Sequence, residues 1–274
     1  MTAMRDDGIV AGDARQGRQA KRQRAITEAV MSAGAVRIEE LAARFDISVM
    51  TVHRDLDELE GRGLLRKSRG VATALSSALV ESSDVYRASR QLAEKDAIAH
   101  AALDFIEPGQ AIMLDDSTTT LHLLPHLAAK KPLTVITNTL TIMEELRSAN
   151  GITMLGLGGQ YYNWCSAYMG RITTTTIENL RADLLVMSTS AISDDVAFHQ
   201  TQETVDVKRA MFESSSRRIL LADHTKFERR ALHAMLPLAQ FDAVIVDARI
   251  DPGHLNRLRD KGINVVVARR TSPQ

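Results

Sequence analysis

Residues 38–59, IEELAARFDISVMTVHRDLDEL, contain two short amphipathic segments separated by a three-residue break. Apolar residues recur at helical spacing in both segments, and they are Ile38, Leu41, Ala42 and Phe45, then Val49, Val52, Leu56 and Leu59. Ser48 is the last residue of the break Asp46-Ile47-Ser48 and is a favourable N-cap for the second segment. This stretch therefore predicts a helix-turn-helix with both apolar faces turned toward a shared core.

The flanking residues extend this unit on both sides. Ile26, Val30 and Ala33 predict an earlier helix that ends at Gly34. Residues 64–73, LLRKSRGVAT, predict two short strands around a basic turn. Residues 17–75 are thus expected to form a winged helix-turn-helix domain, preceded by a disordered tail over residues 1–16.

The second helix of the motif predicts which side chains read DNA. If Val49, Val52, Leu56 and Leu59 face inward, then Met50, Thr51, Arg54 and Glu58 lie on the opposite face. An arginine at the centre of that face can reach the O6 and N7 atoms of guanine in the major groove. Basic residues on the wing would contact the sugar-phosphate backbone. The predicted contacts with double-stranded DNA come from Arg37, Ser48, Met50, Thr51, His53, Arg54, Arg66, Lys67 and Arg69.

The overall composition restricts the alternatives. The 274 residues include 34 basic and 34 acidic ones, so net charge indicates no partner, although the run from Arg15 to Arg24 has no acidic residue and suits a polyanion. Aromatic residues make up 4%, too few to favour single-stranded nucleic acid. A single cysteine excludes an intramolecular disulfide, and no signal peptide or membrane-spanning run is recognisable. A cytoplasmic protein is expected. A three-helix bundle that docks another protein remains an open alternative.

The rest of the chain has a different pattern. Residues 76–90 are rich in serine and predict a linker to a second domain over residues 91–274. In that domain apolar runs of strand length alternate with helical stretches, which predicts an α/β domain with a mostly parallel sheet covered on both faces. The strands are expected at 111–114, 133–137, 152–155, 184–187, 218–222, 243–246 and 263–267, and the helices at 120–129, 140–147, 174–180, 204–215 and 254–261.

Polar residues cluster where these strands end. Parallel sheets bind ligands at the carboxyl ends of their strands, and hydroxyls, free backbone N–H groups and lysines are suited to a phosphate. We therefore predict a site for a small phosphorylated sugar or polyol, although helix capping alone would also explain the threonines. The predicted site residues are Asp115, Ser117, Thr118, Thr119, Thr120, Thr137, Asn138, Gly158, Gly159, Lys208, Asp223 and Lys226.

Both halves resemble the DeoR family of bacterial sugar-metabolism regulators. The motifs are the stretch from Arg24 to Arg66 and, further on, Asp115–Thr120, Thr137–Thr139, Gly158-Gly159, Val207–Met211 and Ala222–Phe227. The resemblance implies a repressor of a sugar or polyol operon, with a sensor domain related in fold to ribose-5-phosphate isomerase and the CoA transferases. Departures from the family pattern occur at His53, at the wing (residues 68–72) and at residues 188–191. Because paired half-sites amplify modest affinity, a homodimer or homotetramer is expected.

An isomerase fused to a DNA-binding domain is the alternative. Isomerisation needs a general base, and related isomerases carry a glutamate where this chain has Val207. Ser190 also replaces an acidic residue of the family, which leaves Asp194, Asp195 or Asp206 as substitutes. We therefore predict no catalytic residue, and neither a metal nor a cofactor.

Overall fold

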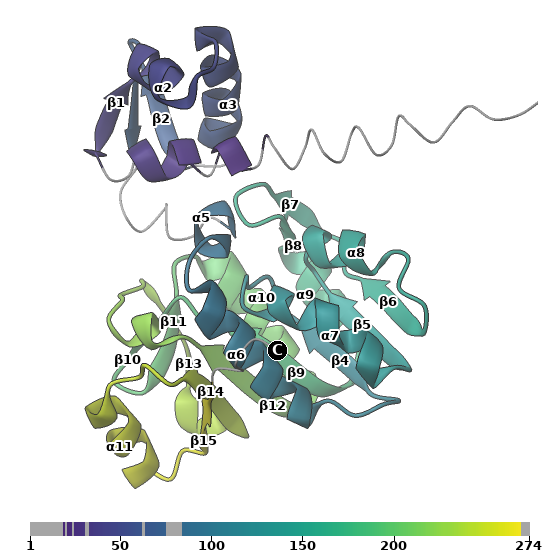
Figure 1. Cartoon of the computed structure of the whole chain (residues 1–274). Helices are drawn as coiled ribbons and strands as arrows, with labels where there is room; N and C mark the ends of the chain where they lie inside the picture. The colour runs from purple at the N-terminus through teal and green to yellow at the C-terminus, as the bar shows by residue number, and fades with distance from the viewer. Residues whose placement is uncertain are drawn as a thin grey trace, which may run out of the picture. The chain divides into compact units, whose positions relative to one another are not determined.

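The computed structural model describes residues 19, 21–23, 25–30, 33–61, 64–74 and 84–269 (Figure 1). Its internal contacts divide the chain into an N-terminal unit, Met1–Ser89, and a C-terminal unit, Arg90–Gln274. The predicted disordered tail and most of the predicted linker lie outside the described residues, and residues 84–88 of that linker form helix α5 (Asp84–Ala88). Within the described ranges, no helix combines the length and the apolar character needed to cross a bilayer.

The N-terminal unit is a winged helix-turn-helix, as predicted. Helical residues 25–30 precede α2 (Ile38–Phe45) and α3 (Val49–Gly61), and strands β2 (Leu65–Ser68) and β3 (Val71–Ala74) form the wing. A third strand, β1 (Ala35–Arg37), pairs antiparallel with β3 and completes a sheet of order β1-β3-β2. The sequence did not predict β1 because three residues are too few to show an alternating pattern.

The start of α3 differs from the prediction in one side chain. Val52, Leu56 and Leu59 are buried in the core as expected, but Val49 is 42% exposed and the predicted inward orientation is wrong. Val49 is the first residue of α3, and this first turn extends beyond the core, so that neighbouring Met50 is 68% exposed. Ser48 Oγ accepts a hydrogen bond from Thr51 N at 3.1 Å, which confirms the predicted N-cap.

The C-terminal unit is built on a seven-stranded sheet of order β15-β14-β12-β9-β4-β5-β6. Every pairing in it is parallel, which confirms the predicted α/β fold. The strands are β4 (Ala111–Leu114), β5 (Leu133–Thr137), β6 (Ile152–Gly156), β9 (Ala182–Ser188), β12 (Ser215–Ala222), β14 (Ala243–Asp247) and β15 (Val265–Ala268).

Helices cover both faces of this sheet (Figure 1). Residues of α6 (Leu92–Ala102), α7 (Leu124–Leu127) and α8 (Leu140–Leu146) pack into the hydrophobic cluster on one face. Residues of α9 (Arg171–Glu178), α10 (Gln202–Glu213) and α11 (Pro252–Asp260) pack into the cluster on the other face. Because all seven strands are parallel, their carboxyl ends lie at one edge of the sheet.

Several elements of this unit were not predicted. Helix α6 was missed because Lys95 and Asp96 interrupt its apolar pattern. The predicted helix over 120–129 is divided into a 3-10 turn η2 (Thr120–Leu123), α7 and a second 3-10 turn η3 (Ala128–Lys130). Short antiparallel strands were also missed, and they are β7 (Gln160–Tyr162), β8 (Ala167–Met169), β10 (Ala191–Ser193), β11 (Val196–His199) and β13 (His233–Pro237).

Candidate functional site

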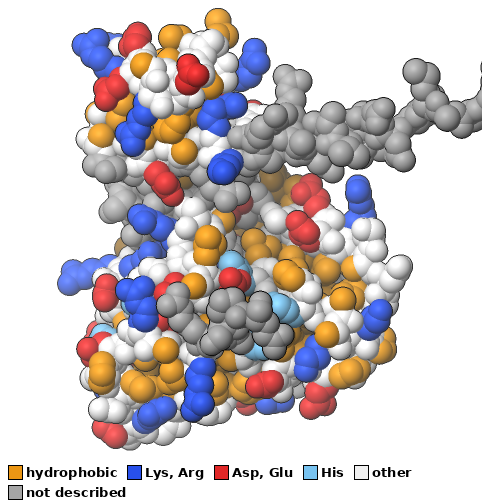
Figure 2. Space-filling view, in the orientation of Figure 1, with side chains coloured by type: hydrophobic (Ala, Val, Ile, Leu, Met, Phe, Trp, Pro, Cys, Tyr) orange, Lys and Arg blue, Asp and Glu red, His pale blue; other side chains and the backbone are white. Residues whose placement is uncertain are grey.

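The predicted DNA-contacting side chains lie at the surface of the N-terminal unit. Met50 and Arg54 are exposed on α3, and Thr51 and His53 beside them are partly exposed. On the wing, Arg69 adopts φ 49° and Gly70 φ 78°, which forms the tight turn between β2 and β3. The visible face of this unit carries lysine and arginine side chains interspersed with acidic ones (Figure 2). Arg37, Ser48, Arg66 and Arg69 are exposed as well.

Three charged residues have roles that the sequence did not predict. Glu58 was expected on the reading face, but it accepts hydrogen bonds from Gln19 and Gln23 of the preceding helix. Lys67 of the wing pairs with Asp57 on α3. A charge pairing of this kind reduces the positive charge that Lys67 offers to a polyanion.

Arg22, which belongs to the basic run, is directed into the protein. Its Nε and Nη2 donate to Asp55 at 2.6 and 3.0 Å, and Gln23 Nε2 also donates to this buried carboxylate at 3.3 Å. The hydrogen bond with Asp55 raises the pKa of Arg22. The pair joins α3 to the helix before the motif, so that a partly buried ion pair helps to fix the orientation of the reading helix.

In the C-terminal unit, the carboxyl ends of β4 and β9 meet at a buried ion cluster. Lys208, on α10, is 1% exposed and donates to Asp115 and to the carbonyl of Ser188 at 3.3 Å. Its Nζ also lies 3.1 Å from Asp116 Oδ1. Ser188 N donates to Asp115 Oδ2 at 2.9 Å. Burial alone would lower the pKa of Lys208, but the two carboxylates raise it, so the ammonium group stays charged.

The hydroxyl-rich loop after β4 is ordered by Asp115. Asp115 Oδ1 accepts from Ser117 N and from Thr120 Oγ1, both at 3.1 Å. Ser117 Oγ accepts from Thr120 N at 3.2 Å. Ser117 and Thr120 therefore shape the loop itself, while Thr118 accepts from the buried Lys95 of α6 at 2.9 Å. Thr119 is buried in the same loop.

The carboxyl end of β12 contributes a third part of the cluster. Asp223 and Lys226 are both buried, and Lys226 Nζ lies 4.0 Å from Asp223 Oδ2. Burial would raise the pKa of Asp223, but Lys226, a hydrogen bond from Thr225 and the charges of Arg229 and Lys95 together lower it. Lys95 of α6 interacts with both strand ends: its Nζ donates to Thr118 after β4, and its charge acts on Asp223 after β12. The ends of β4 and β12 are thus connected by one buried lysine.

The remaining predicted residues support the hairpin formed by β7 and β8. Thr137 Oγ1 accepts from Thr139 N at 3.1 Å, and Asn138 Nδ2 donates to the carbonyl of Tyr168 at 2.9 Å. Gly159 has φ 149°, and a Cβ there would lie 2.1 Å from Thr173 Oγ1. The sequence suggested that Gly159 allows a ligand to approach the backbone. In the structure the side chain of Thr173 occupies this space, and its hydroxyl donates to Gly158 O at 2.8 Å.

Three members of the buried cluster were absent from the predicted site. They are Lys95, Asp116 and Ser188. Lys95 could have been found only by predicting α6, which turns it toward the loop after β4. Ser188 contributes backbone atoms only, and these carry no signal in the sequence.

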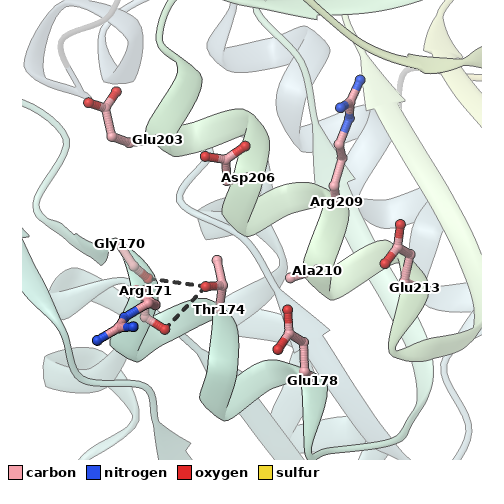
Figure 3. Close-up of a pocket in the computed structure, with 9 residues that line it drawn as sticks. All are labelled: Gly170, Arg171, Thr174, Glu178, Glu203, Asp206, Arg209, Ala210 and Glu213. Carbon is pink, nitrogen blue, oxygen red and sulfur yellow. Dashed lines mark hydrogen bonds between the residues drawn. The ribbon is translucent and has the colours of Figure 1, made fainter.

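The three acidic residues considered as a substitute general base for isomerisation lie away from the buried ion cluster. Asp195 binds Arg257 at 3.0 Å and Lys261 at 2.6 Å; burial would raise its pKa, but these two cations lower it. Asp194 is exposed on the same turn. Asp206 lies on the exposed side of α10, where it and Glu203 line a pocket of about 350 Å³ between α9 and α10 (Figure 3). Lys208 is buried on the other side of this helix, so none of these acids joins the cluster.

Comparison with known proteins identifies both units. Residues 22–78 match the model of the DeoR-like helix-turn-helix domain, and residues 90–248 match the DeoR C terminal sensor domain. The chain is 34% identical to "Transcriptional repressor AccR" of Agrobacterium fabrum, over 85% of this chain and 90% of that protein. It is 31% identical to the "Glycerol-3-phosphate regulon repressor" of Escherichia coli, over 84% and 92% of the two chains.

Among solved structures, ribose 5-phosphate isomerase from Plasmodium falciparum is similar at 14% identity, with a TM-score of 0.36 over 49% of this chain and 52% of that one.

The family matches and the curated relatives establish the class of protein. This chain belongs to the DeoR family of transcriptional repressors. It is a regulator rather than an enzyme.

Proposed function

We propose that the chain represses transcription by binding a double-stranded DNA operator through α3 and the β2–β3 wing, and that a phosphorylated sugar or polyol controls this binding. The supporting observation is the set of buried lysines at the strand ends: Lys95 bonds a hydroxyl of the loop after β4, Lys208 bonds the carboxylate that orders this loop, and Lys226 lies beside Asp223. Ammonium and hydroxyl groups held in a buried site suit a phosphate ester. One relative is named for the regulon of glycerol 3-phosphate, a phosphorylated polyol, which supports this assignment. A repressor that binds operator DNA is expected to act in the cytoplasm.

The three lysines have different roles in this proposal. Lys208 is held by Asp115 and Asp116 and anchors α10 to the end of β4. Lys95 and Lys226 lie beside the hydroxyl loop and beside Asp223, and they supply the positive charge for the phosphate. Thr118 and Thr119 then donate hydroxyl hydrogens to the same group.

Helix α6 connects the effector site to the N-terminal unit in sequence. It begins at Leu92, immediately after the boundary between the two units, and Lys95 lies in its first turn. An effector that binds Lys95 would favour one position of α6. It would control DNA binding if it bound one arrangement of the two units more tightly than the other. Operator half-sites would then be occupied by a homodimer or homotetramer.

A phosphorylated ligand is expected to stabilise the full-length chain against heat. A ligand that binds only the folded state contributes about 2.7 kcal/mol at 100 times its Kd. The measurement is a thermal-shift screen of sugar and polyol phosphates, with each unphosphorylated parent as the control. Equal melting temperatures across the whole panel would contradict the proposed effector class.

Lys226→Met is expected to abolish most of this ligand-induced shift and to leave operator binding unchanged, because the substitution removes a phosphate-binding charge but keeps the aliphatic stem. The readouts are thermal shift and fluorescence anisotropy with labelled operator DNA. Lys130→Met is the matched control, since Lys130 precedes the amino end of β5, at the opposite edge of the sheet. A normal ligand response in Lys226→Met would remove Lys226 from the site.

A further inference from the structure

The edge strand β6 lacks the protection that free sheet edges normally have. Among the described residues, the only strand that pairs with β6 is β5, so the other side of β6 is an open edge of the sheet (Figure 1). Proteins usually protect such an edge with charged side chains, proline or a bulge. Strand β6, with the sequence ITMLG, contains neither a charge nor a proline, and its register with β5 is unbroken. Its backbone groups are therefore available to pair with another strand.

An apolar groove adjoins this edge. It has a volume of about 490 Å³, is lined by residues of α7 and α8, and includes Ile152, the first residue of β6. Thr141 and Glu145 are the only polar residues in its lining. Hydrophobic side chains gather over α7 and α8 on the visible face of the unit (Figure 2). Leu155 points to the opposite face of β6 from Ile152 and is 39% exposed. The open edge thus has apolar surface on both faces.

The sequence around β6 has the composition of a protein interface. Residues 148–170 contain no charged residue, although 25% of the chain is charged. The same stretch carries the only tryptophan, Trp164, and three of the four tyrosines, Tyr161, Tyr162 and Tyr168. Tyr161 is 40% exposed on β7. Interface cores are depleted in charged residues and enriched in aromatic ones, so this stretch favours a protein partner.

The charge pattern and the open edge favour a second copy of this chain as that partner. A strand edge can pair antiparallel with its own copy across a two-fold axis, because each strand offers the donors and acceptors that the other needs. A charged residue close to such an axis would meet its own like charge, and residues 148–170 avoid this repulsion. A different protein would be selected by complementary charges, which this stretch does not offer.

We infer that the open edge of β6 and the adjoining groove form the contact between two copies of this chain. The two β6 strands pair antiparallel across a two-fold axis, which places the α7–α8 faces of both copies on the same side of one continuous sheet. The grooves then lie on either side of the axis and are covered by the other copy. This inference rests on the oligomer expected under the proposed function, and it assigns the surface that forms it.

Leu155→Lys is expected to raise the dissociation constant of the dimer by about tenfold or more, because two ammonium groups meet near the axis and lose water. The measurement is sedimentation velocity of the full-length chain over a range of concentrations, without DNA or ligand. Leu232→Lys is the matched control, since Leu232 is 77% exposed in the same unit and precedes β13, a strand of a different sheet. The control should associate like wild type.

A mixture of Leu155→Lys with Leu155→Glu separates a contact between copies from an effect on the fold. Each variant alone should associate weakly and keep the wild-type circular dichroism, because Leu155 is exposed. In an equal mixture opposite charges meet, and the dimer should recover. A wild-type tetramer that falls to dimers in both variants and recovers in the mixture would support the same surface.

Two results would overturn this surface alone. One is a wild-type oligomer that Leu155→Lys does not weaken, which would place the contact elsewhere in the chain. The other is an equal mixture that does not recover, which would mean that the substitutions act on the fold. A monomeric wild-type chain would also contradict the oligomer expected under the proposed function, and it would leave the β6 edge to a different protein.

Discussion

Lys208→Met is expected to lower the free energy of unfolding of the C-terminal unit by about 3–5 kcal/mol, the usual effect of breaking a buried ion pair by removing one partner. Asp115 and Asp116 are 1% and 4% exposed, and without the ammonium group their charges have lost their closest counterion. Asp115 also orders the loop after β4, so a disturbance at this carboxylate reaches Ser117 and Thr120.

The measurement is urea unfolding of the full-length chain, with Lys130→Met as the control for a lost lysine charge. A loss below about 1 kcal/mol at pH 7 would mean that water replaces Lys208 and that the cluster is not a closed ionic site.

Arg54→Ala is expected to weaken binding to the specific operator by about 1–3 kcal/mol, which corresponds to roughly 5- to 150-fold. Arg54 is exposed on α3, and a bidentate contact with guanine is made only with the correct sequence. Binding to unrelated duplexes depends on phosphate contacts and should change little. The effect of this substitution is therefore a loss of discrimination.

Fluorescence anisotropy with operator and scrambled duplexes at two salt concentrations separates these contributions. Arg259→Ala is the control, because Arg259 is an exposed arginine on α11 in the other unit. Melting temperature and oligomeric state should be unchanged in both variants. If Arg54→Ala weakens both duplexes equally, then Arg54 contacts the backbone and another residue reads the bases.

The sequence predicted the larger elements of the fold well, and the reason is the strength of their patterns. The strands of the parallel sheet are buried on both faces and appear as continuous apolar runs, such as Ala243–Asp247. Helix α6 and strands β1, β7 and β10 are short or interrupted by polar residues, and only tertiary contacts define them. Val49 shows a similar limit, since periodicity cannot indicate where a helix extends beyond its core.

The candidate site was predicted in part. Residue type and position at strand ends identified Asp115, Lys208, Asp223 and Lys226, because such residues are otherwise unexpected after apolar strands. Residue type did not distinguish side chains that shape the site from those available to a ligand. Thr120 and Gly159 satisfy protein groups, whereas the oxygen of Asn138 does not, and this difference is visible only in three dimensions.

The charges of the buried cluster have a further consequence. Three carboxylates, from Asp115, Asp116 and Asp223, face three ammonium groups, from Lys95, Lys208 and Lys226, so these six groups are electrically neutral together. A phosphate dianion that binds Lys95 and Lys226 adds two negative charges to these balanced groups, and Arg229, whose charge also acts on Asp223, offsets one of them. Uptake of one proton by the bound phosphate would offset the other. Occupancy of the site is thereby linked to the acidity of the surrounding solution.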